Sequence, residues 1–252
     1  MSKQDALITG YAERMKRSEE KKRSVLRFLR HEIWSTAPIL QLVIESPHKQ
    51  AINRLLLKLE KEGSVRRDIV DVSQGKGITV WGITTHGQLF ACDDDEEILD
   101  SVFEPSRVSL STIPHTLDVQ RARLKAEQGG WTNWITCDRG SAFKNVPSDH
   151  RPDALVTRPD GVVVAIEVER TVKTRKRYQQ IVASHLKAMA GKHWAKVYYI
   201  TPEKLTKRFE KLIRSMPYIL INGSQVALEE KHLSRFEFVS LEDWPNIGDK
   251  TE

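Results

Sequence analysis

Apolar side chains recur every three to four residues in the first part of the chain, which is the spacing of amphipathic helices. They predict one helix from residue 23, a short second helix at 38–44, and a third helix that Gly63 ends. Residues 1–22 are polar and highly charged, with few large apolar side chains, and we interpret them as a frayed arm or a solvated helix.

After Gly63 the pattern changes to strands. Residues 65–71 and 78–83 predict two strands joined by a tight turn at 73–77, and a small helix begins after Thr85. Three helices followed by a hairpin are the elements of a winged helix-turn-helix. The run INRLLLKLEKEGSVRR, the hairpin and the run WGITTHGQLF together resemble bacterial winged-helix regulators.

The acidic run DDDEE at 93–97 follows directly and predicts a domain boundary. We therefore divide the chain into a charged arm (1–22), a winged helix-turn-helix (23–92), an acidic linker (93–110) and a second domain (111–245). Consecutive Asp residues on an irregular stretch point in several directions, which disfavours a metal site in this run.

The second domain alternates helices and strands. The pattern predicts a helix from about 114, a strand near 131, two strands at 154–157 and 162–169, a helix at 171–190, a strand at 196–201 and a further helix from 202. The fold class is therefore mixed α/β (α+β).

The two strands at 154–157 and 162–169 form a predicted hairpin with chemical consequences. If its turn centres on Asp160, the numbers of paired residues add to 320, and Asp153 faces Glu167. Glu167 and Glu169 lie two apart on one strand, so their side chains share a face with Asp153. Val164, Ile166 and Val168 fill the opposite face.

Burial of three carboxylates costs several kcal/mol unless each is paired or bound to a cation. Carboxylate oxygens suit Mg²⁺ or Mn²⁺, which positions water and neutralises charge on a phosphodiester. The alternative is a structural ion-pair network of Glu167 and Glu169 with Arg170 or Lys173.

Charge is distributed unevenly along the chain, although the net charge is only +6. Residues 1–90 hold 16 basic against 10 acidic side chains, and residues 170–214 hold 13 against two. Two basic blocks favour contact with a polyanion such as DNA; the alternative is a pair of solvated helices rich in Lys.

Composition excludes other classes. The two cysteines lie far apart, without metal-ligand spacing, and no apolar run reaches the roughly 20 residues of a membrane span. We expect a cytoplasmic protein. No motif for nucleotide hydrolysis, dinucleotide binding or serine and zinc hydrolase chemistry occurs. Seven histidines, His150 and His185 among them, show no ligand spacing, and we interpret them as surface or core residues.

A nuclease signature emerges from these residues. Pro152, Asp153 and the sequence Glu167-Val168-Glu169 resemble the PD-(D/E)XK motif of restriction-endonuclease-like domains, with Glu169 in place of the usual lysine. Together with the winged helix, residues 25–205 resemble MobC-class plasmid mobilization relaxases and, more distantly, the replication-relaxation proteins.

The resemblance implies a metal-dependent DNA endonuclease that nicks one strand at an origin of transfer. Asp153, Glu167 and Glu169 would hold Mg²⁺ or Mn²⁺, and Lys173 is our candidate for the missing lysine. Further residues could support the reaction. These are His115, Asp118, Arg170, Arg177 and Tyr178, with Arg170 and Arg177 as transition-state clamps. Tyr178 is either a covalent nucleophile or a core aromatic residue.

The exposed face of the third predicted helix carries side chains suited to base edges: Lys49, Gln50, Asn53 and Arg54. Four further basic residues are better placed for phosphate: Lys58, Arg66, Arg67 and Lys76. The alternative is a winged helix that mediates protein contacts only.

The expected partner is double-stranded DNA at the origin of transfer, with a conjugative coupling protein or other relaxosome proteins, and a homodimer is left open. Two alternative functions remain at this stage. One is a catalytically inactive DNA-binding relaxosome accessory or transcriptional regulator, which the missing lysine favours. The other is a restriction-type endonuclease.

Overall fold

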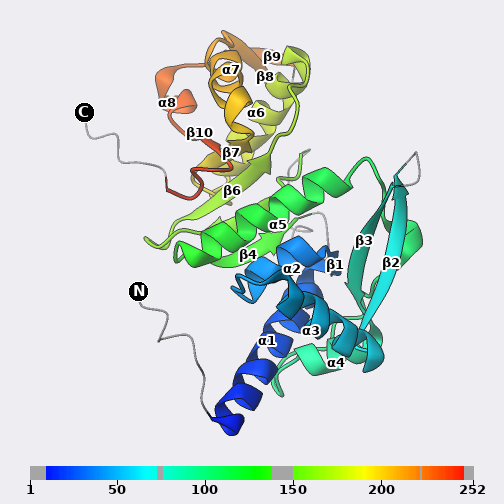
Figure 1. Cartoon of the computed structure of the whole chain (residues 1–252). Helices are drawn as coiled ribbons and strands as arrows, with labels where there is room; N and C mark the ends of the chain where they lie inside the picture. Colours follow the sequence, from blue (N-terminus) through cyan, green and yellow to red (C-terminus); the bar gives the residue numbers. More distant parts are fainter. Residues whose placement is uncertain (1–9, 73–75, 138–149, 222, 247–252) are drawn as a thin grey trace. The chain divides into compact units, whose positions relative to one another are not determined.

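The computed structural model describes residues 10–72, 76–137, 150–221 and 223–246, and the side chains of Val72 and Lys76 lie outside the description. The fold is mixed α/β, as predicted, with helices and three sheets (Figure 1). Backbone contacts divide the chain into two compact units, Met1–Leu117 (unit 1) and Asp118–Glu252 (unit 2). No described helix is long and apolar enough to cross a membrane.

Unit 1 contains three helices followed by a hairpin, in the predicted order. Its elements are α1 (Tyr11–Glu32), β1 (Trp34–Ser35), α2 (Ala37–Val43), α3 (Lys49–Lys61), β2 (Val65–Val72), β3 (Lys76–Ile83), α4 (Thr85–Ala91) and the 3-10 helix η2 (Pro105–Arg107). The strands form one antiparallel sheet in the order β1-β3-β2. Part of the predicted arm is thus the exposed start of α1.

The core of unit 1 follows from helical spacing. Ile52, Leu56 and Leu59 of α3 lie on one face at intervals of four and three residues, and all three are fully buried. Thr84 caps α4 because its Oγ1 accepts a hydrogen bond from Gly87 N at 3.0 Å. These contacts hold α3 and α4 in place beside the hairpin.

The acidic segment has partners within unit 1. Asp93 pairs with Arg23 and Arg27 of α1, and Glu96 accepts a hydrogen bond from Arg27 Nη2 at 2.9 Å. Phe103 is buried, and its ring lies where a side chain on Gly82 would stand. Asp93 and Glu96 thus contact α1, and Phe103 anchors the segment to unit 1, whereas Asp94, Asp95 and Glu97 are exposed.

Unit 2 is built around a five-stranded mixed sheet. Its elements are α5 (Ile113–Gln128, which begins in unit 1), β4 (Thr132–Thr136), β5 (Ala154–Thr157), β6 (Val163–Val168), α6 (Arg175–Ala190), β7 (Val197–Thr201), α7 (Glu203–Arg214), β8 (Tyr218–Ile221), β9 (Ser224–Ala227), α8 (Glu230–Leu233) and β10 (Phe236–Ser240). The sheet order is β10-β7-β6-β5-β4, and β8 pairs with β9 separately.

Helices cover both faces of the large sheet. Val119, Ala122 and Ala126 of α5 pack on one face, and α6 and α7 pack on the other (Figure 1). Strands β4, β5 and β6 are antiparallel, whereas β7 runs parallel to β6 after the crossover through α6. Residues that follow β6 therefore lie near the beginning of α6 and the end of β7.

Candidate active site

The β5–β6 hairpin has the predicted register. Ala154 pairs with Ile166 and Thr157 with Val163, so the numbers of paired residues add to 320. Gly161 has a φ of +83° and closes the turn by donating its N–H to Arg158 O at 2.9 Å. The structure confirms this register for residues 154–157, and Asp153 stands directly before β5, where its N–H donates to Ile166 O at 3.0 Å.

The two faces of β6 also separate as predicted. Val164, Ile166 and Val168 pack in the α5-side core, whereas Ala165 packs in the core on the side of α6 and α7. Glu167 shares the face of Ala165 because side chains alternate along a strand. Glu167 and Glu169 are both buried, with 3% and 4% of their surface exposed.

Asp153 and Glu169 each have a defined partner. Asp153 Oδ2 accepts a hydrogen bond from Val168 N at 2.7 Å, and Glu169 Oε1 accepts one from Lys173 Nζ at 2.6 Å. Burial raises the pKa of Glu169 above its ordinary value, although the bond from Lys173 opposes this. The predicted helix from 171 begins later, because Thr174 caps α6, and Lys173 reaches Glu169 from the irregular segment before it.

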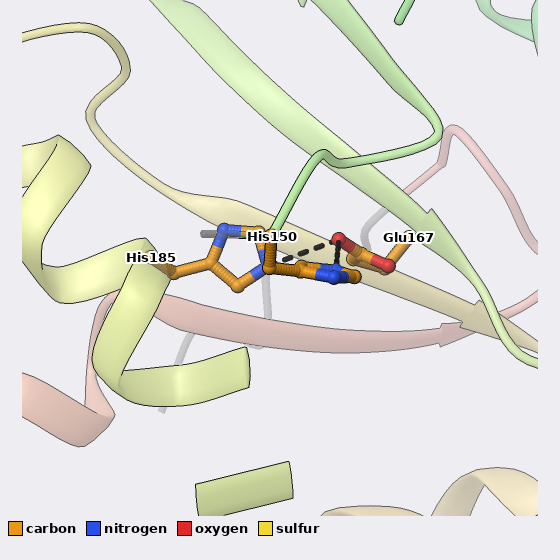
Figure 2. Close-up of side chains that lie close together, drawn as sticks. All are labelled: His150, Glu167 and His185. Atoms are coloured by element: carbon orange, nitrogen blue, oxygen red, sulfur yellow. Dashed lines mark hydrogen bonds and ion pairs between the residues drawn. The ribbon is translucent and has the colours of Figure 1, made fainter. Parts of the chain in front are cut away.

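Glu167 stands between two histidines, His150 and His185, which the sequence predicts to be surface or core residues. Figure 2 shows the rings of His150 and His185 directed toward its carboxylate. The Nε2 atoms of the two rings lie 2.8 Å and 3.0 Å from the same Oε1. Burial alone would raise the pKa of Glu167, but hydrogen bonds and electrostatic attraction from the two histidines outweigh it and lower the pKa from 4.5 to about 2. Glu167 is therefore ionised.

The histidines form a second set of possible metal ligands with Glu167. Among the described residues, one group of His, Cys, Asp and Glu has ligand atoms close enough to hold a metal ion: His150, Glu167 and His185, with one atom from each within 4.8 Å of the others. This group shares only Glu167 with the predicted trio. One feature of the sequence could have pointed to this group: His150 stands only three residues before Asp153, next to the predicted site.

The supporting residues are distributed differently from the prediction. Asp118 is buried and forms an ion pair with Arg170, so the Arg170 guanidinium has a structural partner. Asp118 also accepts a hydrogen bond from Arg121 Nη1 at 2.8 Å. Arg177 is exposed in the first turn of α6. His115 lies on the first turn of α5, in the part of that helix that belongs to unit 1.

Tyr178 lies in the core of unit 2. Its side chain is fully buried, 5.0 Å from Phe209 between ring centroids, and its hydroxyl accepts a hydrogen bond from Lys173 N at 3.1 Å. Burial raises the pKa of Tyr178 to about 12. These contacts agree with the core interpretation of this residue and disfavour an attacking tyrosinate.

The residues predicted to contact base edges occupy the exposed side of unit 1. Lys49 and Gln50 begin α3, and Asn53 and Arg54 follow on its exposed face. Three of the residues predicted to contact phosphate form long ion pairs with acidic side chains, with nitrogen–oxygen distances of 3.4–3.9 Å. These pairs are Lys58 with Glu19 and Glu62, Arg66 with Asp68, and Arg67 with Glu60. The Lys76 side chain lies outside the described residues.

Comparison with known families identifies the chain. The profile of the replication-relaxation family matches residues 26–195, which include α2, α3, the β5–β6 hairpin and α6. The chain belongs to the replication-relaxation family. Membership in this family suggests a role in plasmid replication or mobilization. No curated protein and no solved structure matches this replication-relaxation protein.

Proposed function

We propose that this replication-relaxation protein is a plasmid mobilization relaxase of the MobC class, which nicks one strand of DNA by metal-dependent phosphodiester cleavage. In this proposal unit 1 is a winged helix-turn-helix that binds double-stranded DNA at the origin of transfer. Unit 2 is a PD-(D/E)XK nuclease domain that cleaves nearby. The two tasks need two DNA-facing surfaces, and both units carry exposed basic residues.

One observation carries the nuclease assignment. Asp153 stands directly before β5, and its Oδ2 accepts a hydrogen bond from the N–H of Val168, the residue between Glu167 and Glu169. Among the described residues, this hairpin belongs to a series of helix, three antiparallel strands, helix and parallel strand, from α5 to β7. The PD-(D/E)XK resemblance implies the same series. The order of the elements therefore supports the nuclease assignment in addition to the motif residues.

In this proposal the divalent cation is held by the three carboxylates. Asp153, Glu167 and Glu169 are acidic groups gathered at a strand end, two of them buried, and such oxygens are what Mg²⁺ and Mn²⁺ prefer. A bound cation would neutralise charge on the scissile phosphate and lower the pKa of water. Lys173 brings its ammonium within 2.6 Å of Glu169, which places a positive charge where the motif usually has lysine.

Exposed basic residues adjoin this site. Lys173, Arg175, Lys176 and Arg177 are all exposed, directly after the strand that carries Glu167. Because each phosphate contact releases a bound counterion, such a stretch favours binding of a DNA backbone. In this proposal these exposed residues hold the DNA backbone next to the acids.

Recognition is assigned to the exposed face of α3. We expect Arg54→Ala to lower the ratio of affinities for cognate and random DNA by roughly 5-fold to 150-fold, because a bidentate contact to a base discriminates by about 1–3 kcal/mol. Fluorescence anisotropy with an origin fragment and a scrambled fragment measures this ratio.

Arg66→Ala provides the matched control for Arg54→Ala, because both residues are exposed arginines of unit 1. As a phosphate contact, Arg66 should contribute equally to the affinities for cognate and random DNA. Its removal should reduce the slope of log affinity against log salt concentration by about one, because one fewer counterion is released on binding. Equal discrimination by wild type and Arg54→Ala would place base recognition elsewhere.

A specific observation favours a second function, that of an inactive DNA-binding accessory or regulatory protein. The Lys173 ammonium is engaged by Glu169, and Glu167 Oε1 is engaged by two imidazoles, so the site is satisfied without a cation. Under this alternative, unit 2 docks relaxosome partners or a coupling protein instead of cleaving DNA.

Incubation with supercoiled plasmid that carries the origin, in Mg²⁺ or Mn²⁺, separates the candidates. A relaxase converts the plasmid to open circles with one nicked strand. A restriction-type endonuclease yields linear DNA through double-strand cuts. An accessory protein binds the origin and leaves the plasmid supercoiled.

A further inference from the structure

His150, Glu167 and His185 come from three separate elements and meet at one carboxylate oxygen. His150 precedes β5, Glu167 lies on β6 and His185 lies on α6 (Figure 2). Ser184 Oγ accepts a hydrogen bond from His150 N at 3.0 Å, so α6 positions both histidines. The two rings stand nearly perpendicular, with centroids 5.5 Å apart. The arrangement is thus held by the fold.

The spacing of the ligand atoms suits a cation. Two ligand atoms about 2.1 Å from a metal stand about 3.0 Å apart at a right angle and about 3.4 Å apart in a tetrahedron. The observed separations of Nε2 from Glu167 Oε1 are 2.8 Å and 3.0 Å, and all three ligand atoms lie within 4.8 Å of one another. Small shifts would place a cation between them.

The chemistry of the donors selects the cation. Imidazole nitrogen is a good ligand for Zn²⁺ and other divalent transition metals, whereas Mg²⁺ requires oxygen ligands and retains its waters. We propose that His150, Glu167 and His185 bind one divalent transition-metal ion, of the Zn²⁺ type. This inference rests on the proposed function in one respect: Glu167 belongs both to the proposed carboxylate site and to the histidine cluster. Binding of the ion does not require DNA cleavage.

The surroundings of His185 bear on the strength of the site. His185 is fully buried, and its Nδ1 has no hydrogen-bond partner among the described residues. A metal at Nε2 leaves the remaining ring proton on Nδ1 without an acceptor, and we therefore expect moderate affinity.

Equilibrium dialysis of the full chain against Zn²⁺, after removal of metal with a chelator, tests this site. We expect one Zn²⁺ per chain, and excess Mg²⁺ should not displace it. His150→Ala should weaken Zn²⁺ binding by at least about 10-fold, since this ring is a direct ligand. His193→Ala removes a histidine of the same unit outside the cluster and should leave binding unchanged.

Histidine side-chain NMR of the unmodified protein gives a second readout that does not depend on a variant folding. Zn²⁺ should shift the ring resonances of His150 and His185 together, at one equivalent. Absence of binding, or binding that His150→Ala leaves intact, would overturn the proposal.

Asp153→Asn separates the metal proposal from the proposed nuclease. This variant should lose nicking and keep Zn²⁺ binding, because Asp153 is outside the histidine cluster. A protein that binds Zn²⁺ and never nicks DNA refutes the nuclease function alone. A protein that nicks with Mg²⁺ and binds no Zn²⁺ refutes the metal proposal alone.

Discussion

Replacement of Asp153 by asparagine is expected to reduce nicking of supercoiled plasmid by about 100-fold or more. A cation held by carboxylates supplies several kcal/mol of transition-state stabilisation, and each 1.4 kcal/mol is a factor of ten in rate. Asparagine keeps an oxygen that can accept the bond from Val168 N, which Asp153 Oδ2 receives at 2.7 Å. The substitution therefore removes charge and leaves the hairpin intact.

Asp160→Asn is the matched control for this experiment. Asp160 belongs to the same hairpin, is exposed, and accepts a hydrogen bond from Val162 N at 3.2 Å in the turn. It lies at the opposite end of β5 from Asp153, so this variant should nick DNA at the wild-type rate. If the two variants nick equally well, Asp153 has no part in catalysis and the carboxylate assignment fails.

Leu56→Ala is expected to lower the free energy of unfolding of unit 1 by about 2–5 kcal/mol. Leu56 is fully buried on α3, and truncation of such a side chain costs its burial energy and leaves a cavity. Hydrogen exchange of α3 amides in increasing urea measures the effect in this unit separately. Because α3 carries the proposed DNA contacts, we also expect weaker binding of the origin.

Leu57→Ala tests whether burial causes the effect of Leu56→Ala. The adjacent Leu57 is 52% exposed on the same helix, so its truncation should change stability by less than about 0.5 kcal/mol. Equal losses in the two variants would contradict the assigned inner face of α3.

The hairpin of unit 2 could be predicted from sequence because its signals are local. Gly161 supplies the positive φ that the turn requires, and the apolar residues Val164, Ile166 and Val168 of β6 share one face, which together fix the register of Ala154 opposite Ile166. In unit 1, the apolar spacing of α3 was equally informative, since its buried face is continuous.

The histidine cluster could not be found in the same way. His185 follows Glu167 by 18 residues and reaches it only because α6 crosses back over the sheet. No fixed spacing encodes such a contact. The ion pairs of the acidic segment escape sequence analysis for a related reason, because Asp93 and Glu96 pair with Arg27, more than 60 residues earlier in the chain. The local composition of a charged segment indicates that it is solvated, but it cannot show which of its side chains pair with residues far away in the sequence.

The most direct test of the account is the product of the wild-type protein on supercoiled origin plasmid, with Mg²⁺ or Mn²⁺ and with a chelator. We predict open circles nicked in one strand at one position, formed only with the divalent ion. Plasmid that stays supercoiled while the protein binds the origin would contradict the nuclease assignment.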